Sequence, residues 1–132
     1  MIDSIFVNYC DDIRFERGDK ISLIGVYGPN MIVPTFPITL PRLCMFLQIT
    51  SKAGSGITEP ITIEVLSDKN VIQSAESPAD QFPLPYEGDG RARIACHIEL
   101  AALTLEKPCE LWVRVKYARK SFKTYTLKVT RS

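Results

Sequence analysis

Hydrophobic and polar residues alternate along most of this chain with the two-residue period that is typical of β-strands. In residues 12–16 (DIRFE), Ile13 and Phe15 share one face and the charged side chains share the other. Residues 20–28 (KISLIGVYG) and 43–50 (LCMFLQIT) are nearly continuous apolar runs rich in branched side chains, which is typical of strands covered on both faces. The pattern predicts eight or nine strands, at residues 4–10, 12–16, 20–28, 43–50, 61–67, 71–75, 91–100, 109–118 and 123–129.

The segments between these strands are rich in proline and glycine. Residues 28–42 contain four prolines, and residues 76–90 contain three prolines and two glycines, which excludes a helix or a central strand in either segment. Residues 99–107 (ELAALTLEK) contain good helix formers and are expected to cross from one strand to the next, with a short helix as an option. These features predict an all-β fold, a single antiparallel β-sandwich domain of residues 1–132 of the immunoglobulin-like or C2-like type.

Length and composition limit the class of protein. A chain of 132 residues with 45% hydrophobic content suits one domain with one core. No apolar run approaches the ~20 residues of a membrane-spanning helix, and Asp3 stands where an export signal would be basic, so we expect a cytoplasmic protein. The four cysteines form no Cys-x-x-Cys motif and are expected to be reduced and largely buried.

Charge is unevenly distributed along the chain. Residues 1–90 carry six Lys and Arg against twelve Asp and Glu, whereas residues 91–132 carry ten against three. We expect the two parts to neutralise each other within the domain; the alternative is a basic face that binds nucleic acid or an acidic protein. The residues that would form this face are Trp112, Arg114, Lys116 and Lys128, with Arg91, Arg93, Arg119, Lys120 and Lys123 around them.

The last two predicted strands are expected to pair as a hairpin. The register that turns Tyr125 inward places Arg114 opposite Lys128 on the outer face. Two cations that face each other destabilise a strand pair, so we expect an acid on an adjacent strand, Glu64 or Glu99, to compensate them.

Catalytic and metal-binding constellations are not evident in the sequence. His97, the only histidine, alternates with Cys96 and Ile98, so a Cys–His pair is disfavoured. The common motifs of hydrolases, nucleotide-binding enzymes and metalloproteases are absent, and we expect no catalytic residue, metal ligand or cofactor. Turn acids could gather around calcium, although solvated turns are the simpler explanation. These acids are Asp11, Asp12, Asp68, Asp80, Glu87 and Asp89.

Two adjacent carboxylates follow Cys10. Asp11 would share the inward face with Ile13 and Phe15, where a carboxylate needs a partner, whereas Asp12 falls on the solvent face. Both are predicted to be structural carboxylates. An open pocket or a bound cation beside Asp11 would instead indicate a functional site.

Three motifs carry a resemblance to a known family: the Cys-Asp-Asp opening at residues 10–12, the strand at residues 22–27 (SLIGVY) and the step at residues 40–44 (LPRLC). Over residues 9–49 the chain resembles a bacterial family of small single-domain proteins classed as a domain of unknown function. The resemblance implies a stand-alone cytoplasmic protein of bacterial or phage-related origin. It implies no activity, substrate, cofactor or catalytic residue.

The leading hypothesis for function is a non-enzymatic protein-interaction module, because sandwich folds commonly bind partners through long loops or an exposed edge strand. One candidate loop contains Pro34 and Phe36, and the other contains Phe82 and Tyr86; these side chains either bind a partner or seal the end of the sandwich. The expected partner is another protein or a second copy of the chain, with no role for a membrane. Alternatives are a structural subunit of a phage-like or other assembly, and binding of nucleic acid or an acidic partner through the basic C-terminal hairpin.

Overall fold

The computed structural model describes residues 1–18, 20–77 and 88–132. These residues form ten β-strands and no helix, so none of the described segments is a helix that could cross a membrane. The strands are β1 (Ile2–Phe15), β2 (Ile21–Val26), β3 (Asn30–Val33), β4 (Ile38–Ser51), β5 (Ile61–Ser67), β6 (Asn70–Ser77), β7 (Arg93–Leu105), β8 (Cys109–Tyr117), β9 (Lys120–Lys123) and β10 (Leu127–Arg131).

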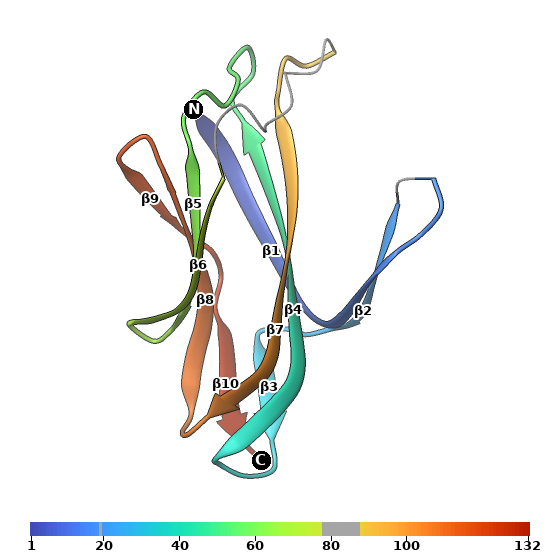
Figure 1. The fold of residues 1–132 in the computed structure, drawn as a ribbon, viewed down its shortest axis with the longest axis vertical. Coiled ribbons are helices and arrows are strands. Elements are labelled where there is room, and N and C mark those ends of the chain that lie inside the picture. The colour runs from blue at the N-terminus through green and yellow to red at the C-terminus, as the bar shows by residue number, and fades with distance from the viewer. Residues whose placement is uncertain (19, 78–87) are drawn as a thin grey trace.

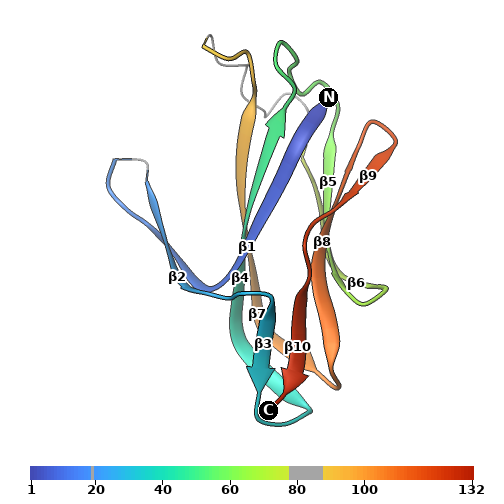
Figure 2. The same cartoon turned by 180° about the vertical axis from the view of Figure 1, so that it is seen from behind.

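The strands form two sheets that face each other (Figure 1). The four-stranded sheet has the order β2-β1-β4-β7, and the six-stranded sheet has the order β3-β10-β8-β5-β6, with β9 also paired to β8. All the pairs are antiparallel except β3 with β10. The predicted all-β sandwich is confirmed. The view from behind shows β3 and β10 side by side at one end of it (Figure 2).

The core lies between the two sheets and follows the predicted alternation. Every second side chain of β4 and of β8 points inward and is almost fully buried, because each faces the opposite sheet. Burying one such side chain contributes about 1.5–3 kcal/mol to stability. The two rows are Leu43, Met45, Leu47 and Ile49 on β4, and Leu111, Val113, Val115 and Tyr117 on β8.

Strand β2 is less covered than its apolar sequence predicts. Among the described residues it pairs only with β1, and the β1–β2 hairpin extends away from the sandwich (Figure 1). Ile24 and Val26 are therefore exposed. The apolar composition could not reveal this position, because an outer strand and a central strand can have the same sequence pattern.

Residues 99–107 form no helix. Strand β7 continues through them as far as Leu105, and the end of β7 pairs with Ile38–Leu40 of β4. Ala102 has a positive φ of 52°, and it is the one residue in this stretch without a pairing partner on β4, although the register is the same on both sides of it. Hydrogen bonding to β4 over this stretch overrides the helix propensity of the segment.

The predicted register of the last hairpin is wrong. The chain turns at Ala118 and Arg119, whose φ angles are 50° and 64°, and this short turn places Arg114 opposite Lys123. The hydroxyl of Thr124 then bonds the backbone of Val113 and interrupts the pairing before β10 begins. Tyr125 falls in this interruption and is exposed instead of pointing inward.

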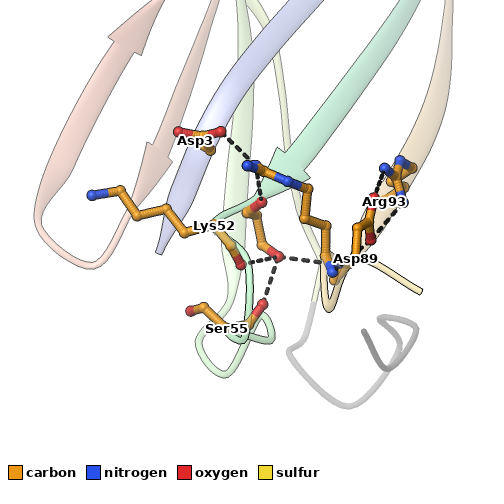
Figure 3. A network of polar contacts seen from close by, with 8 residues as sticks. Asp3, Lys52, Ser55, Asp89 and Arg93 are labelled. Carbon is orange, nitrogen blue, oxygen red and sulfur yellow. Dashed lines mark hydrogen bonds and ion pairs between the residues drawn. The ribbon is translucent and has the colours of Figure 1, made fainter. Parts of the chain in front are cut away.

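A polar network joins the start of β1, the end of β4 and the start of β7 (Figure 3). The buried Ser51 hydroxyl accepts the N–H of Ala92 at 2.8 Å and donates to the carbonyl of Ser55 at 2.5 Å. The Arg91 guanidinium donates to the carbonyl of Ser51 at 3.1 Å and to Asp3 at 2.5 Å. These bonds fix the chain on both sides of the turn after β4 and just before β7.

Candidate functional site

Asp11 has a structural partner, but it does not lie on the buried face. Its carboxylate is exposed and accepts a 2.6 Å hydrogen bond from the Tyr27 hydroxyl. Burial of the Tyr27 ring, together with this bond, raises the pKa of Tyr27 to about 12. The predicted inward orientation is wrong because β1 leaves β4 at Cys10 and continues in the projecting hairpin, where no second sheet covers it.

The backbone opposite Asp11 is adapted to its carboxylate. Gly25 lies across from Asp11 in the β1–β2 register and has a φ of +66°. A Cβ atom at this position would lie 2.9 Å from Cγ of Asp11 and would overlap the carboxylate oxygen. Glycine is therefore suited to this position for two reasons: it adopts the left-handed backbone readily, and it has no side chain to occupy the space of the Asp11 carboxylate.

Asp12 belongs to an ion-pair network that joins three strands of the four-stranded sheet. It forms ion pairs with Arg42 on β4 at 3.1 Å and with Arg14 on β1 at 3.7 Å, and one of its oxygens accepts the N–H of Ile13 at 2.9 Å. Arg42 also contacts Glu99 on β7 at 3.1 Å. Both acids of the Cys-Asp-Asp opening thus bond groups of the protein itself.

The predicted basic and aromatic face is present only in part. Trp112, Arg114 and Lys116 share the outer face of β8, where Glu64 of β5 lies opposite Arg114. The Glu64 carboxylate is 2.8 Å from Nε of Arg114 and 3.2 Å from Nζ of Lys116. The hydrogen bond from Arg114 and the second cation lower the pKa of Glu64. Of the two acids expected to compensate these cations, Glu64 does so, whereas Glu99 pairs with Arg42.

The Trp112 ring is already in contact with cations of the chain. Nζ of Lys123 lies 4.7 Å and Cζ of Arg114 lies 5.8 Å from the ring centroid, and the indole N–H donates to the carbonyl of Asp68 at 2.8 Å. Lys128 does not join this group, because it lies on β10 opposite Glu110.

The two arginines at the start of β7 also lie apart from the predicted basic face. Arg93 is the first residue of β7 in the four-stranded sheet and pairs with Asp89. Arg91 lies two residues before β7 and pairs with Asp3. The predicted neutralisation between the two parts of the chain therefore holds for these arginines, as it does for Arg114 and Lys116.

The two named residues of the first predicted binding loop differ in their surroundings. Pro34 is exposed, but Phe36 is half-buried and packs against the main core. Phe36 therefore covers the core, as one of the two alternatives for this loop predicted. Phe82 and Tyr86 lie outside the described residues.

Three groups that could take part in catalysis, Cys96, His97 and Glu99, line one cleft between β6 and β7. His97 points away from Cys96, as predicted, and its ring lies 5.0 Å from that of Phe15. Burial raises the pKa of Cys10 to about 11 and also raises the pKa of Cys96, which makes these thiols poor nucleophiles. In the part of the chain that the structure describes, no three His, Cys, Asp or Glu side chains are placed to hold a metal ion. Two of the turn acids considered for calcium, Asp80 and Glu87, lie outside that part.

The cleft between β6 and β7 is one concave feature of the described residues, and the sequence pattern did not predict it. It encloses about 310 Å³ between the inner face of the six-stranded sheet and the inner face of β7. Ile63 and Ala75 line one wall, and Cys96 and Ile98 line the other. Among the described residues, β6 and β7 each have one strand partner, so each presents an unpaired edge at this side of the sandwich.

A sequence signal for this cleft exists in β6. Its register with β5 turns Gln73, Ala75 and Ser77 inward, opposite Val65, Ile63 and Ile61. These three side chains are small or polar, so they do not fill the space that large apolar side chains fill elsewhere in the core. A strand with small or polar side chains at its inward positions therefore indicates that the two sheets are not fully packed together at that edge.

Comparison with known proteins identifies a family whose function is unknown. A model described as "Family of unknown function (DUF6941)" matches residues 5–130, nearly the whole chain. No protein with curated annotation matches it.

Proposed function

The chain belongs to this family of unknown function, and we propose from its geometry that it is a protein-interaction module whose β6–β7 cleft binds an extended segment of a partner protein. The observation that carries the proposal is the position of the cavity between two unpaired strand edges. An extended segment is the one ligand that can use the edges and the cavity together.

The backbone supplies the first argument for an extended ligand. An unpaired edge presents a row of N–H and C=O groups that can pair with another strand. Natural edge strands are usually protected by Lys, Pro or inward charges, but β6 contains no Lys, Arg or Pro. All of β6 except Ser77 is exposed. Within the described residues, this edge is therefore available for pairing and lacks the usual protection.

The side chains supply the second argument. In an extended segment every second residue points to the same side, so alternate side chains of the ligand would enter the cleft. Ile63 and Ile98 offer apolar contacts there, and Gln73 offers an amide for a hydrogen bond. A cavity of about 310 Å³ has room for one or two apolar side chains. We therefore expect a ligand with apolar residues at alternate positions.

Cys96 provides a direct measurement of occupancy. It is half-buried and lines the cleft, whereas Cys10, Cys44 and Cys109 are buried. Alkylation should therefore modify Cys96 first, because it is the most accessible of the four thiols. The reaction needs alkaline pH, because burial raises the pKa of Cys96 and the thiolate is the reactive form. A segment bound in the cleft should slow this modification. Faster modification of another cysteine would contradict the placement of Cys96.

The test selects binders from a display library of random peptides and measures their affinity by calorimetry. Ala75→Arg fills the cleft from β6, and Ser74→Arg adds the same charge on the opposite face of the same strand. We expect selected peptides to have alternating apolar residues, to protect Cys96, and to lose binding to Ala75→Arg but not to Ser74→Arg. Peptides that bind both variants equally, or no enrichment at all, would refute the proposal.

The same variants separate a partner protein from a second copy of the chain. A structural subunit should sediment as a ring or polymer. If Ala75→Arg disperses such an assembly and Ser74→Arg does not, the segment in the cleft comes from another copy. A monomer that binds the selected peptides supports a separate partner.

The setting that we propose is the bacterial cytoplasm. The four cysteines are free, and Cys10 and Cys44 remain thiols although they are register partners on β1 and β4. Thiols that are mostly buried and unpaired fit a reducing compartment. Fractionation of the native cell, with an antibody against the chain, tests this placement.

A further inference from the structure

The β8–β9 hairpin contains an excess of positive charge that the described residues neutralise only in part. Residues 111–132 include seven Lys and Arg and no Asp or Glu. Five of these cations lie on the hairpin, and we call them the cationic arm: Arg114, Lys116, Arg119, Lys120 and Lys123. In the described part of the chain, Glu64 is the only carboxylate in an ion pair with the arm.

The tip of the arm is the least neutralised part. Arg119 and Lys120 are exposed and form no ion pair within the described residues, and Lys123 contacts the Trp112 ring. The hairpin ends in a turn that stands apart from the four-stranded sheet (Figure 1, Figure 2). A ligand could therefore approach these side chains from solvent.

The turn holds a charged residue in a backbone conformation that favours glycine. Ala118 and Arg119 have φ angles of 50° and 64°, and two-residue hairpin turns of this kind prefer Asn-Gly. A non-glycine residue in the left-handed region destabilises the backbone. Arg119 thus stands at the tip despite a local conformational cost, and such costs cluster at binding sites and turns.

We propose that the cationic arm binds a short acidic segment of a partner protein. From Arg114 to the tip at Arg119, the strand rises about 3.3 Å per residue, so the arm spans roughly 17 Å. This length matches about five extended residues, whose carboxylates would pair with Lys116 and Lys123 on the outer face and with Arg119 at the turn. Lys120 lies opposite the inward Tyr117, on the other face of the hairpin, and adds its charge at the tip. The inference is independent of the β6–β7 cleft, because β8 and β6 lie on opposite sides of β5.

Several observations favour a short acidic peptide over nucleic acid. The Trp112 ring is in contact with Lys123 and Arg114, so it is a poor platform for base stacking. Glu64 keeps a negative charge within the patch, and Glu110 and Glu76 share the outer face of this sheet beyond it. A nucleic-acid strand that continued past the arm would meet these acids, whereas a short segment would not.

The test uses a fluorescent peptide that contains six consecutive glutamates and a labelled single-stranded oligonucleotide of equal charge. Anisotropy is measured at low and at high salt. The double variant Arg119→Gly with Lys120→Ser removes both charges of the tip, and its glycine suits the turn, so it should fold at least as well. The control, Lys107→Ser with Arg131→Ser, removes two exposed cations outside the arm.

We expect the glutamate peptide to bind at low salt and to weaken as salt rises. The tip variant should bind it about tenfold more weakly with no fall in melting temperature, and the control should change its affinity less than about twofold. Absence of peptide binding at low salt, an equal loss in both variants, or tighter binding of the oligonucleotide than of the peptide would overturn the proposal. The last result would assign the arm to nucleic acid instead.

Discussion

Replacement of Gly25 by alanine tests the interpretation of the Cys-Asp-Asp opening. The left-handed φ of +66° should cost an L-residue about 1–2 kcal/mol. The new Cβ must also displace the Asp11 carboxylate, because it would lie 2.9 Å from Cγ of Asp11. That displacement breaks the 2.6 Å hydrogen bond from Tyr27, which is worth about 1 kcal/mol at an exposed site. The free energy of unfolding should therefore fall by about 2–3 kcal/mol.

The two contributions can be separated with a double-mutant cycle. In the Asp11→Ala background the collision and the hydrogen bond are both absent, so Gly25→Ala should cost only the backbone term of about 1–2 kcal/mol. Guanidinium titrations of the four proteins give the free energies, and the slope with denaturant shows whether the native state stays compact. In thermal melts, the single variant should lose about 6–12 °C.

Two results would refute this reasoning. An equal cost of Gly25→Ala in both backgrounds, within about 0.3–0.5 kcal/mol, would show that the carboxylate moves aside freely. A loss below about 0.5 kcal/mol in both would show that Gly25 is not required for the left-handed backbone. In either case the structural role of Asp11 would need another explanation.

Two further predictions concern other polar groups. Tyr9→Phe removes a buried hydroxyl that donates to the carbonyl of Tyr125 at 2.8 Å, so urea titration should show a loss of about 1–2 kcal/mol; a loss below about 0.3 kcal/mol would contradict this role. The hydrogen bond from Arg93 lowers the pKa of Asp89 from 3.8 to about 2. Because the folded pKa lies below the unfolded value, the stabilisation is present above pH 3.8 and is lost as the pH falls through about 2. Arg93→Gln should flatten the pH dependence of the unfolding midpoint in this window, and identical profiles would contradict the prediction.

Several features of the fold could be predicted from the sequence because they are local. The alternation in residues 109–118 places Leu111, Val113 and Val115 inward, and all three are fully buried. The same reasoning turns His97 away from Cys96, as the pairing of β7 with β4 places them. A side chain's face depends on its position within its own strand, so a period of two residues is sufficient to assign it.

Other features depended on contacts between distant segments. The apolar stretch of β2 could equally have been a central strand, and residues 99–107 could have been a helix; pairing with β1 and with β4 decided both. The register of the last hairpin depended on positive φ angles at Ala118 and Arg119, which sequence preferences alone would assign to Asn-Gly.

For the candidate sites, the sequence determined which side chains are acidic, basic or apolar and that the chain is all-β. It also indicated that Asp11 needs a partner and that the C-terminal part has excess positive charge. Only the tertiary structure placed Glu64 between Arg114 and Lys116, and only the strand order brought the edges of β6 and β7 to one cleft. The physical reason is that alternation encodes the face of a strand but not its neighbour, and neighbours are selected by packing and hydrogen bonding across the whole chain.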